Sequence, residues 1–265
     1  MVFRVALTTA ILMLAPLSVL ACSATSDCVI DNGTYRISLP ETGDAPLGAI
    51  VFAHGYQGSA AGVMKNKSLV RVAADRGLAL IAIDAGANDW NLPNAPGDSV
   101  KSRDEMAYLD AVMADVAEKF GINPKRTVIT GFSAGGMFVW NVICNRGDAY
   151  AGYIPYSGTF WKGPPASCPA PAQNIVHVHG TGDTTVPMEG RKIGDTRQGD
   201  LAQVLAMYMK DKDFAPDDGY ALVDMNCSHA TSIGDKRLDL CLFDGNHSFT
   251  AERLGAAYDK LMPKG

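Results

Sequence analysis

The sequence has few positive charges and no cluster of them. Its 23 lysines and arginines are outnumbered by 28 aspartates and glutamates, which gives a net charge of -5. A nucleic-acid-binding face needs grouped Lys and Arg to neutralise phosphates, so we expect no nucleic-acid partner. The chain also lacks closely spaced Cys and His of the kind that bind zinc. We therefore expect no metal site.

Internal repeats, low-complexity tracts and Pro/Gly-rich linkers are also missing. With 265 residues, 47% of them hydrophobic and 19% charged, the composition is that of an ordinary globular protein. We predict a single catalytic domain over residues 22–265, preceded by a segment of different character.

That segment, residues 1–21, has one cation, Arg4, followed by an apolar run and then by short residues at its end. The pattern is typical of a cleaved secretory signal peptide. A membrane span is the competing interpretation, but the run is shorter than the roughly 20 residues that a spanning helix needs, and it contains Pro16. We predict a secreted or periplasmic protein with no stable membrane span.

Export makes the cysteines informative, because six of them form an even set for an oxidising compartment. Of the fifteen possible pairings, nearest neighbours are preferred: Cys144 with Cys168, Cys227 with Cys241, and, as the weakest pair, Cys22 with Cys28. A lipid anchor at Cys22 is a minor alternative, since "VLAC" resembles a bacterial lipoprotein box. Lipidation of Cys22 would leave five cysteines, one of which could form no disulfide within the chain.

Short apolar runs alternate with stretches of helical spacing, which predicts an α/β fold with a mainly parallel sheet and helices on both faces. The expected strands are 34–39, 49–53, 78–83, 127–130, 152–157, 174–179 and 237–243. The expected helices are 63–76, 104–120, 134–145, 201–211 and 248–262. Residues 84–100 form a long loop after a strand, at the place where open α/β sheets bind ligands.

The stretch "RTVITGFSAGGMFVW", residues 126–140, contains the clearest motif. Gly131 to Gly135 fit G-x-S-x-G between a strand and a helix, a context in which the serine sits on a tight turn and is presented as a nucleophile. Ser133 is therefore the predicted nucleophile. The competing interpretation is a serine that caps the helix in a glycine-rich turn.

A serine nucleophile needs a base, and the sequence offers five histidines. His247 follows the last apolar strand and precedes the last helix, where this fold supplies its base. His177 and His179 lie in an apolar strand, where a structural role is more typical. His229 has no accompanying pattern, and His54 precedes a glycine at a strand end. His247 is the predicted base.

The base in turn needs a carboxylate that fixes its tautomer. Asp183 follows a strand and lies between Ser133 and His247, which gives the α/β-hydrolase order Ser, Asp, His. Asp244 is the rival, but its closeness to His247 in the chain is more typical of a turn residue.

Backbone amides must hold the oxyanion that develops on the substrate. The amide of Ala134, directly after the nucleophile, is one candidate. The second should come from the turn "HGYQG" after an early strand, where Tyr56 is preferred and one residue on either side is open.

These motifs together resemble a known family. "IVFAHGYQGSA", the stretch from "DWNLPNAPGDSV" to "ITGFSAGGMF", "HVHGTGDTTVP" and "GNHSF" are similar to secreted α/β-hydrolase esterases of the polyhydroxybutyrate-depolymerase and feruloyl-esterase type. The likeness covers most of the chain after residue 21 and is weakest over 184–235. It implies a carboxylic-ester hydrolase that needs no cofactor, with Ser133, Asp183 and His247 matching the triad motifs.

The departures from that family bear on the substrate. Ser248 and Phe249 stand where the family commonly has Trp-Pro, and no polymer-binding domain follows the histidine, so soluble esters or oligomers are expected rather than a solid polymer. These include hydroxybutyrate-oligomer, feruloyl and acetyl esters. The expected substrate-binding residues are Trp90, Trp161 and Gln57. The alternatives are a serine peptidase of the same fold and a non-catalytic binding protein.

Overall fold

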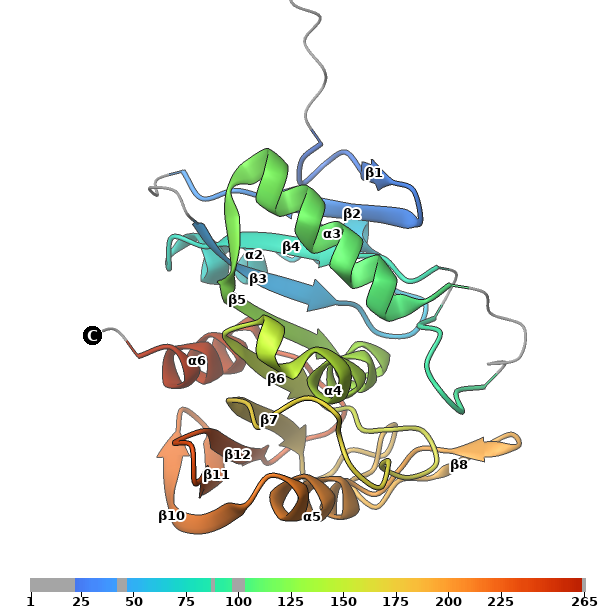
Figure 1. The fold of residues 1–265 in the computed structure, drawn as a ribbon, viewed down its shortest axis with the longest axis vertical. Coiled ribbons are helices and arrows are strands. Elements are labelled where there is room, and N and C mark those ends of the chain that lie inside the picture. Colours follow the sequence, from blue (N-terminus) through green and yellow to red (C-terminus); the bar gives the residue numbers. More distant parts are fainter. Residues whose placement is uncertain (1–21, 42–46, 87–88, 97–102, 264–265) are drawn as a thin grey trace, which may run out of the picture.

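The computed structural model describes residues 22–41, 47–86, 89–96 and 103–263. The expected signal peptide lies outside these residues. A ten-stranded sheet runs through the molecule in the order β1-β2-β4-β3-β5-β6-β7-β12-β11-β10 (Figure 1). Its strands are β1 (Cys28–Ile30), β2 (Gly33–Ser38), β3 (Leu47–Ala53), β4 (Ala79–Ile83), β5 (Ile122–Phe132), β6 (Gly152–Tyr156), β7 (Ile175–Gly180), β10 (Phe214–Leu222), β11 (Met225–Ser232) and β12 (Arg237–Phe243).

The middle of the sheet, from β4 through β3, β5, β6 and β7 to β12, is parallel. Strands β4, β6 and β7 are buried along their whole length, because helices cover both faces. A strand covered on both faces needs apolar residues at every position, which is why the sequence reads as continuous apolar runs there. The prediction of a mainly parallel sheet is confirmed.

In the part of the chain that the structure describes, six α-helices form the two outer layers. They are α1 (Ala60–Lys65), α2 (Lys67–Ala74), α3 (Glu105–Phe120), α4 (Ala134–Arg146), α5 (Leu201–Asp211) and α6 (Ala251–Leu261), and a short 3-10 turn, η2 (Gly147–Ala149), follows α4. Apolar side chains of α3, α4 and α5 share one core on one face of the sheet. Those of α1, α2 and α6 share a second core on the other face, in the arrangement visible in Figure 1.

Two departures from the expected elements have local causes. The expected helix 63–76 is two helices, because Asn66 ends α1 and its side chain accepts from the Leu69 amide at the start of α2. Strands β1, β10 and β11 lie outside the expected strands. Strand β10 contains Pro216 and Gly219, its register with β11 shifts between Asp217 and Tyr220, and most of its residues are exposed, so it shows no apolar run. It pairs only with β11, at the sheet edge.

All six cysteines are paired, as Cys22–Cys28, Cys144–Cys168 and Cys227–Cys241. The preferred nearest-neighbour pairing is confirmed in this structure. Cys227 and Cys241 face each other directly across β11 and β12. Because the Cys22 sulfur is bonded to Cys28, it offers no thiol to the lipid considered above. None of the described helices is long and apolar enough to cross a membrane.

Candidate active site

Ser133 occupies the turn between β5 and α4, at the carboxyl edge of the sheet. Its backbone has φ 60° and ψ -120°, a strained conformation that costs on the order of 1 to 3 kcal/mol in a residue other than glycine. The Ser133 amide donates to the Tyr156 carbonyl on the neighbouring strand, at 2.9 Å. Its side chain makes no capping hydrogen bond to α4. The helix-cap interpretation of this serine is therefore wrong.

The glycines around Ser133 are needed because three backbone segments meet at this turn. A Cβ atom on Gly131 would lie 2.5 Å from the Gly135 carbonyl oxygen, and one on Gly135 would lie 2.0 Å from the carbonyl oxygen of Ala53. Real Cβ atoms do not approach backbone this closely. Strand β3, the turn and the start of α4 can therefore pack together only when these positions lack side chains.

Asp183 and His247 come from loops that follow β7 and β12, two neighbouring strands. Backbone hydrogen bonds hold these loops together, from Thr181 to Phe243 and from Gly182 to Gly245. His247 Nδ1 lies 2.6 Å from Asp183 Oδ2. The His247 ring also packs against the ring of Phe132, the residue before Ser133, with ring centroids 4.5 Å apart. The structure thus brings the three predicted residues to one edge of the sheet.

Asp183 is held rigidly and ionised. Its other oxygen, Oδ1, accepts hydrogen bonds from the amides of Thr185 and Val186, at 2.9 and 2.8 Å. Burial opposes ionisation of the carboxyl group, but the hydrogen bonds from His247 and the Val186 amide outweigh it and lower the pKa of Asp183. An ionised Asp183 requires a proton on Nδ1 of His247, which leaves Nε2 free to accept one.

The turn after β3 approaches Ser133 closely. A Cβ on Gly55 would lie 3.4 Å from the Ser133 Cβ, and the next residue, Tyr56, lines the same pocket as Ser133. His54 fixes this turn: its Nδ1 donates to the Gly55 carbonyl at 2.7 Å, and its Nε2 accepts from the Ala85 amide at 3.1 Å. His54 is thus fully engaged in shaping the turn.

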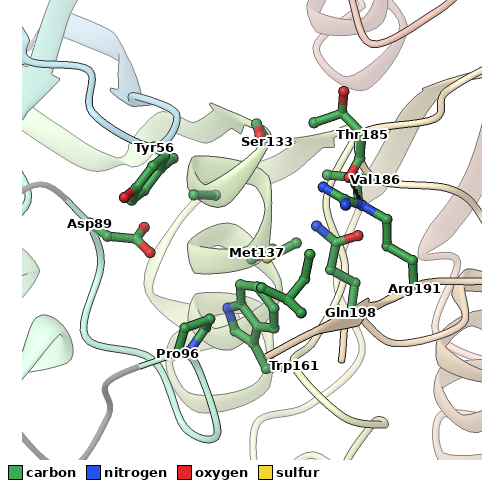
Figure 2. Close-up of a pocket in the computed structure, with 12 residues that line it drawn as sticks. Tyr56, Asp89, Pro96, Ser133, Met137, Trp161, Thr185, Val186, Arg191 and Gln198 are labelled. Carbon is green, nitrogen blue, oxygen red and sulfur yellow. Dashed lines mark hydrogen bonds between the residues drawn. The ribbon is translucent and has the colours of Figure 1, made fainter. Parts of the chain in front are cut away.

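A pocket of about 550 Å³ opens at Ser133, within the roughly 300 to 1,000 Å³ range of small-molecule sites. Figure 2 shows Ser133 at one end of it, Met137 and Trp161 deeper inside, and Tyr56 and Asp89 across from Thr185, Arg191 and Gln198. The complete lining is Tyr56, Asp89, Pro96, Ser133, Ala134, Met137, Trp161, Thr185, Val186, Arg191, Ile193 and Gln198.

The three expected substrate-binding residues are placed differently. Trp161 lines the pocket. Trp90 does not: it is fully buried, stacks on Phe138 and donates its indole N–H to the His54 carbonyl at 2.8 Å. Gln57 is exposed and lies outside the pocket lining. Trp90 is therefore a core residue that supports the turn carrying Tyr56. Neither Trp90 nor Gln57 belongs to the pocket lining, so the expected substrate contacts of these two residues are not found.

Residues 185–198 supply nearly half of the pocket lining, a contribution that no sequence pattern predicts. This segment contains the two-stranded hairpin β8 (Lys192–Ile193) and β9 (Thr196–Arg197). It carries Arg191, Ile193 and Gln198 to the wall opposite Tyr56. The segment has no apolar periodicity, and two-residue strands are too short to produce one.

The remaining histidines have structural partners. His229 Nδ1 bonds to Asp239, which is fully buried and also accepts from Tyr220 and Arg237. His177 and His179 form a buried chain behind Asp183: Trp140 Nε1 donates to His177, His177 Nε2 to His179 Nδ1, and His179 Nε2 to the Val186 carbonyl. Each ring then uses one nitrogen as donor and one as acceptor, so both rings are neutral.

The buried, hydrogen-bonded pair of His177 and His179 predicts a loss of stability in mild acid. Burial, followed by the neighbouring His179, lowers the pKa of His177 well below its ordinary 6.5, and burial also lowers that of His179. Below pH 6.5 the unfolded chain binds protons that the folded protein excludes, so stability falls as pH decreases. We expect the unfolding free energy to drop between pH 7 and 5 by about 1 to 2 kcal/mol through His177, and by a smaller amount through His179.

Denaturant unfolding at pH 7, 6 and 5, with disulfides intact, measures this effect above the range in which carboxylates titrate. His177→Gln, which removes one titrating ring, should show a shallower dependence than the parent. Equal stability of the parent at pH 7 and 5 would contradict the assignment of two neutral buried rings.

Within the described residues, no group of three or more His, Cys, Asp or Glu side chains is arranged to hold a metal ion.

Comparison with known proteins finds sequences similar to this chain. Residues 92–209 match the phospholipase/carboxylesterase family. NocK of Nocardia uniformis subsp. tsuyamanensis is 25% identical over 154 residues, which cover 58% of this chain and 44% of that protein. The bifunctional acetylxylan esterase/xylanase XynS20E of Neocallimastix patriciarum is 28% identical over 85 residues, 32% of this chain and 12% of that protein. The aligned part therefore spans less than half the length of either relative.

Solved structures share the fold. An acetyl xylan esterase from Aspergillus awamori superimposes with a TM-score of 0.56 at 13% identity, covering 86% of this chain and 91% of that one. A carboxylesterase from Bacillus cereus superimposes with a TM-score of 0.56 at 12% identity, covering 86% and 94%. The chain has the α/β-hydrolase fold.

Proposed function

We propose that the protein is a serine carboxylic-ester hydrolase that acts through an acyl-enzyme. The observation that carries the proposal is the strained Ser133, whose side chain makes no capping hydrogen bond to α4 and opens onto a pocket near the hydrogen-bonded pair of Asp183 and His247. Backbone strain at a serine whose side chain caps no helix end is not explained by local structure. A serine nucleophile needs such a turn, because the turn exposes its hydroxyl to the substrate. The matches to carboxylesterases support the same chemistry.

The proposed reaction uses each residue in a defined role. His247 Nε2 takes the proton from the Ser133 hydroxyl as its oxygen attacks the ester carbonyl carbon. The amides of Ala134 and Tyr56 hold the resulting oxyanion. The protonated His247, stabilised by Asp183, then gives the proton to the leaving alcohol. Water, activated by the same ring, hydrolyses the acyl-enzyme and restores Ser133.

The substrates we propose are soluble esters or oligomers, including hydroxybutyrate-oligomer, feruloyl and acetyl esters. The pocket supports this size of ligand, since its volume suits a small molecule. Residues 22–265 would act as one domain exported by the segment 1–21, and the three disulfides of the described chain are compatible with an oxidising compartment.

Paired substrates test the reaction class. We expect hydrolysis of 4-nitrophenyl acetate and far slower hydrolysis of 4-nitroacetanilide, because an anilide carbonyl is less electrophilic than an ester carbonyl and its amine is a poorer leaving group than 4-nitrophenolate. Release of 4-nitrophenol and 4-nitroaniline is read from absorbance. Comparable rates would favour the serine peptidase, and no turnover of any ester would favour a binding protein.

A further inference from the structure

The pocket wall opposite Tyr56 carries two polar side chains that the proposed reaction does not use, Arg191 and Gln198. They flank the hairpin of β8 and β9, and the Gln198 amide donates to the Arg191 carbonyl at 2.8 Å. Both side chains line the pocket that opens at Ser133. Figure 2 shows the Arg191 guanidinium and the Gln198 carboxamide pointing the same way, into the pocket.

Gln198 is buried and incompletely bonded. The residue is 5% exposed, and its Oε1 has no hydrogen-bond partner. Leaving a buried amide unpaired costs about 1 to 3 kcal/mol, so such groups in native proteins call for an explanation. The two ends of a carboxamide can exchange by a half-turn, so Gln198 can offer either its amino group or its oxygen to a bound molecule.

Arg191 keeps its charge available to the pocket. Its Nε donates to the Thr185 carbonyl at 2.7 Å, which holds the guanidinium against the loop that also carries Asp183. In the described part of the chain, no carboxylate lies within ion-pair distance of Arg191. The two terminal nitrogens therefore remain as donors of charge-assisted hydrogen bonds.

The rest of the pocket defines the shape of a matching ligand. Apolar side chains make up much of the remaining lining, namely those of Met137, Trp161, Val186 and Ile193. The Asp89 carboxylate lies on the opposite wall, beside Tyr56. The guanidinium of Arg191 attracts an anionic group to its side of the pocket, so the pocket suits a ligand whose apolar body ends in a negative charge.

We infer that Arg191 and Gln198 form a subsite for a carboxylate on the ester substrate. The inference rests on the proposed function and narrows its substrate class to esters in which one arm, separated from the scissile carbonyl by an apolar spacer, ends in a carboxylate. Arg191 binds the carboxylate through its terminal nitrogens. Gln198 donates its amino group to the same carboxylate or accepts from a hydroxyl on the spacer.

Two substrate pairs test the subsite and identify the arm. In the first, 4-nitrophenyl hydrogen adipate carries a carboxylate on the acyl arm and is compared with 4-nitrophenyl hexanoate. In the second, the linear dimer of 3-hydroxybutyrate carries a carboxylate on the alcohol arm and is compared with its methyl ester. The specificity ratio is kcat/KM for the anionic ester divided by that for its neutral partner, corrected for hydrolysis without enzyme.

The ratio should exceed one for at least one pair, and Arg191→Ala should lower it by about tenfold, the effect of one hydrogen-bonded charge. Arg197→Ala is the matched control, because it removes the same charge from the same hairpin at a position outside this pocket. It should leave the ratio unchanged. Gln198→Leu should lower the ratio to a smaller extent, because leucine has a volume similar to that of glutamine and the change removes a neutral hydrogen-bonding group rather than a charge.

The outcomes separate this inference from the proposed function. Turnover of the neutral esters with ratios at or below one in both pairs would overturn the subsite and leave the esterase. A ratio above one that persists in Arg191→Ala, or that Arg197→Ala lowers equally, would also overturn it. No turnover of any ester would remove the proposed function itself.

Discussion

Ser133→Ala is expected to reduce kcat for 4-nitrophenyl acetate by at least about a thousandfold, because the variant keeps the pocket and the oxyanion amides but has no nucleophile. The fold should survive, since the Ser133 side chain makes no capping hydrogen bond and alanine occupies the same backbone. Circular dichroism and thermal unfolding would confirm a folded variant.

The matched control is Ser228→Ala, which removes an exposed hydroxyl from β11, near the sheet edge. It should retain the parent's activity. Residual activity of Ser133→Ala above about a thousandth of the parent's would point to a different nucleophile, and the mechanism proposed above would fail.

Asp183→Asn is expected to lower kcat by about a thousandfold to ten-thousandfold. The amides of Thr185 and Val186 hold one oxygen of Asp183, so an asparagine would keep its carbonyl oxygen there and turn its amino group toward His247. A donor facing Nδ1 forces the ring proton onto Nε2. The ring would then present an N–H to Ser133 and could not act as its base.

Asp244→Asn provides the comparison, because Asp244 is the carboxylate nearest to His247 in the sequence. Asp244 is exposed and makes none of the described hydrogen bonds to His247, so its variant should keep nearly full activity. Both variants are assayed for kcat on the same ester. A larger loss in Asp244→Asn than in Asp183→Asn would reverse the assignment.

Much of the fold and the candidate triad could be predicted because their causes are local. Buried parallel strands need continuous apolar runs, and a nucleophile turn needs glycines at fixed spacing, so both leave patterns in the sequence. The order of Ser133, Asp183 and His247 along the chain then indicated which loops should meet. The structure brings these loops together at the carboxyl edge of the sheet.

The pocket wall could not be predicted, because its cause is tertiary. Arg191 and Gln198 belong to a segment without periodicity, and only the packing of the β8–β9 hairpin against Trp161 brings them to Ser133. The buried position of Trp90 could not be predicted for a related reason. Its loop position suggested a surface role, but a hydrogen bond to the His54 carbonyl and stacking on Phe138 draw it into the core.

The most direct test of the central claim is covalent labelling of the folded protein with a fluorophosphonate, read by intact mass and by peptide mapping. An activated serine should gain one phosphonyl group, located on the peptide that contains Ser133 and absent from Ser133→Ala. A protein that gains no label, or gains it on another residue, would contradict the account.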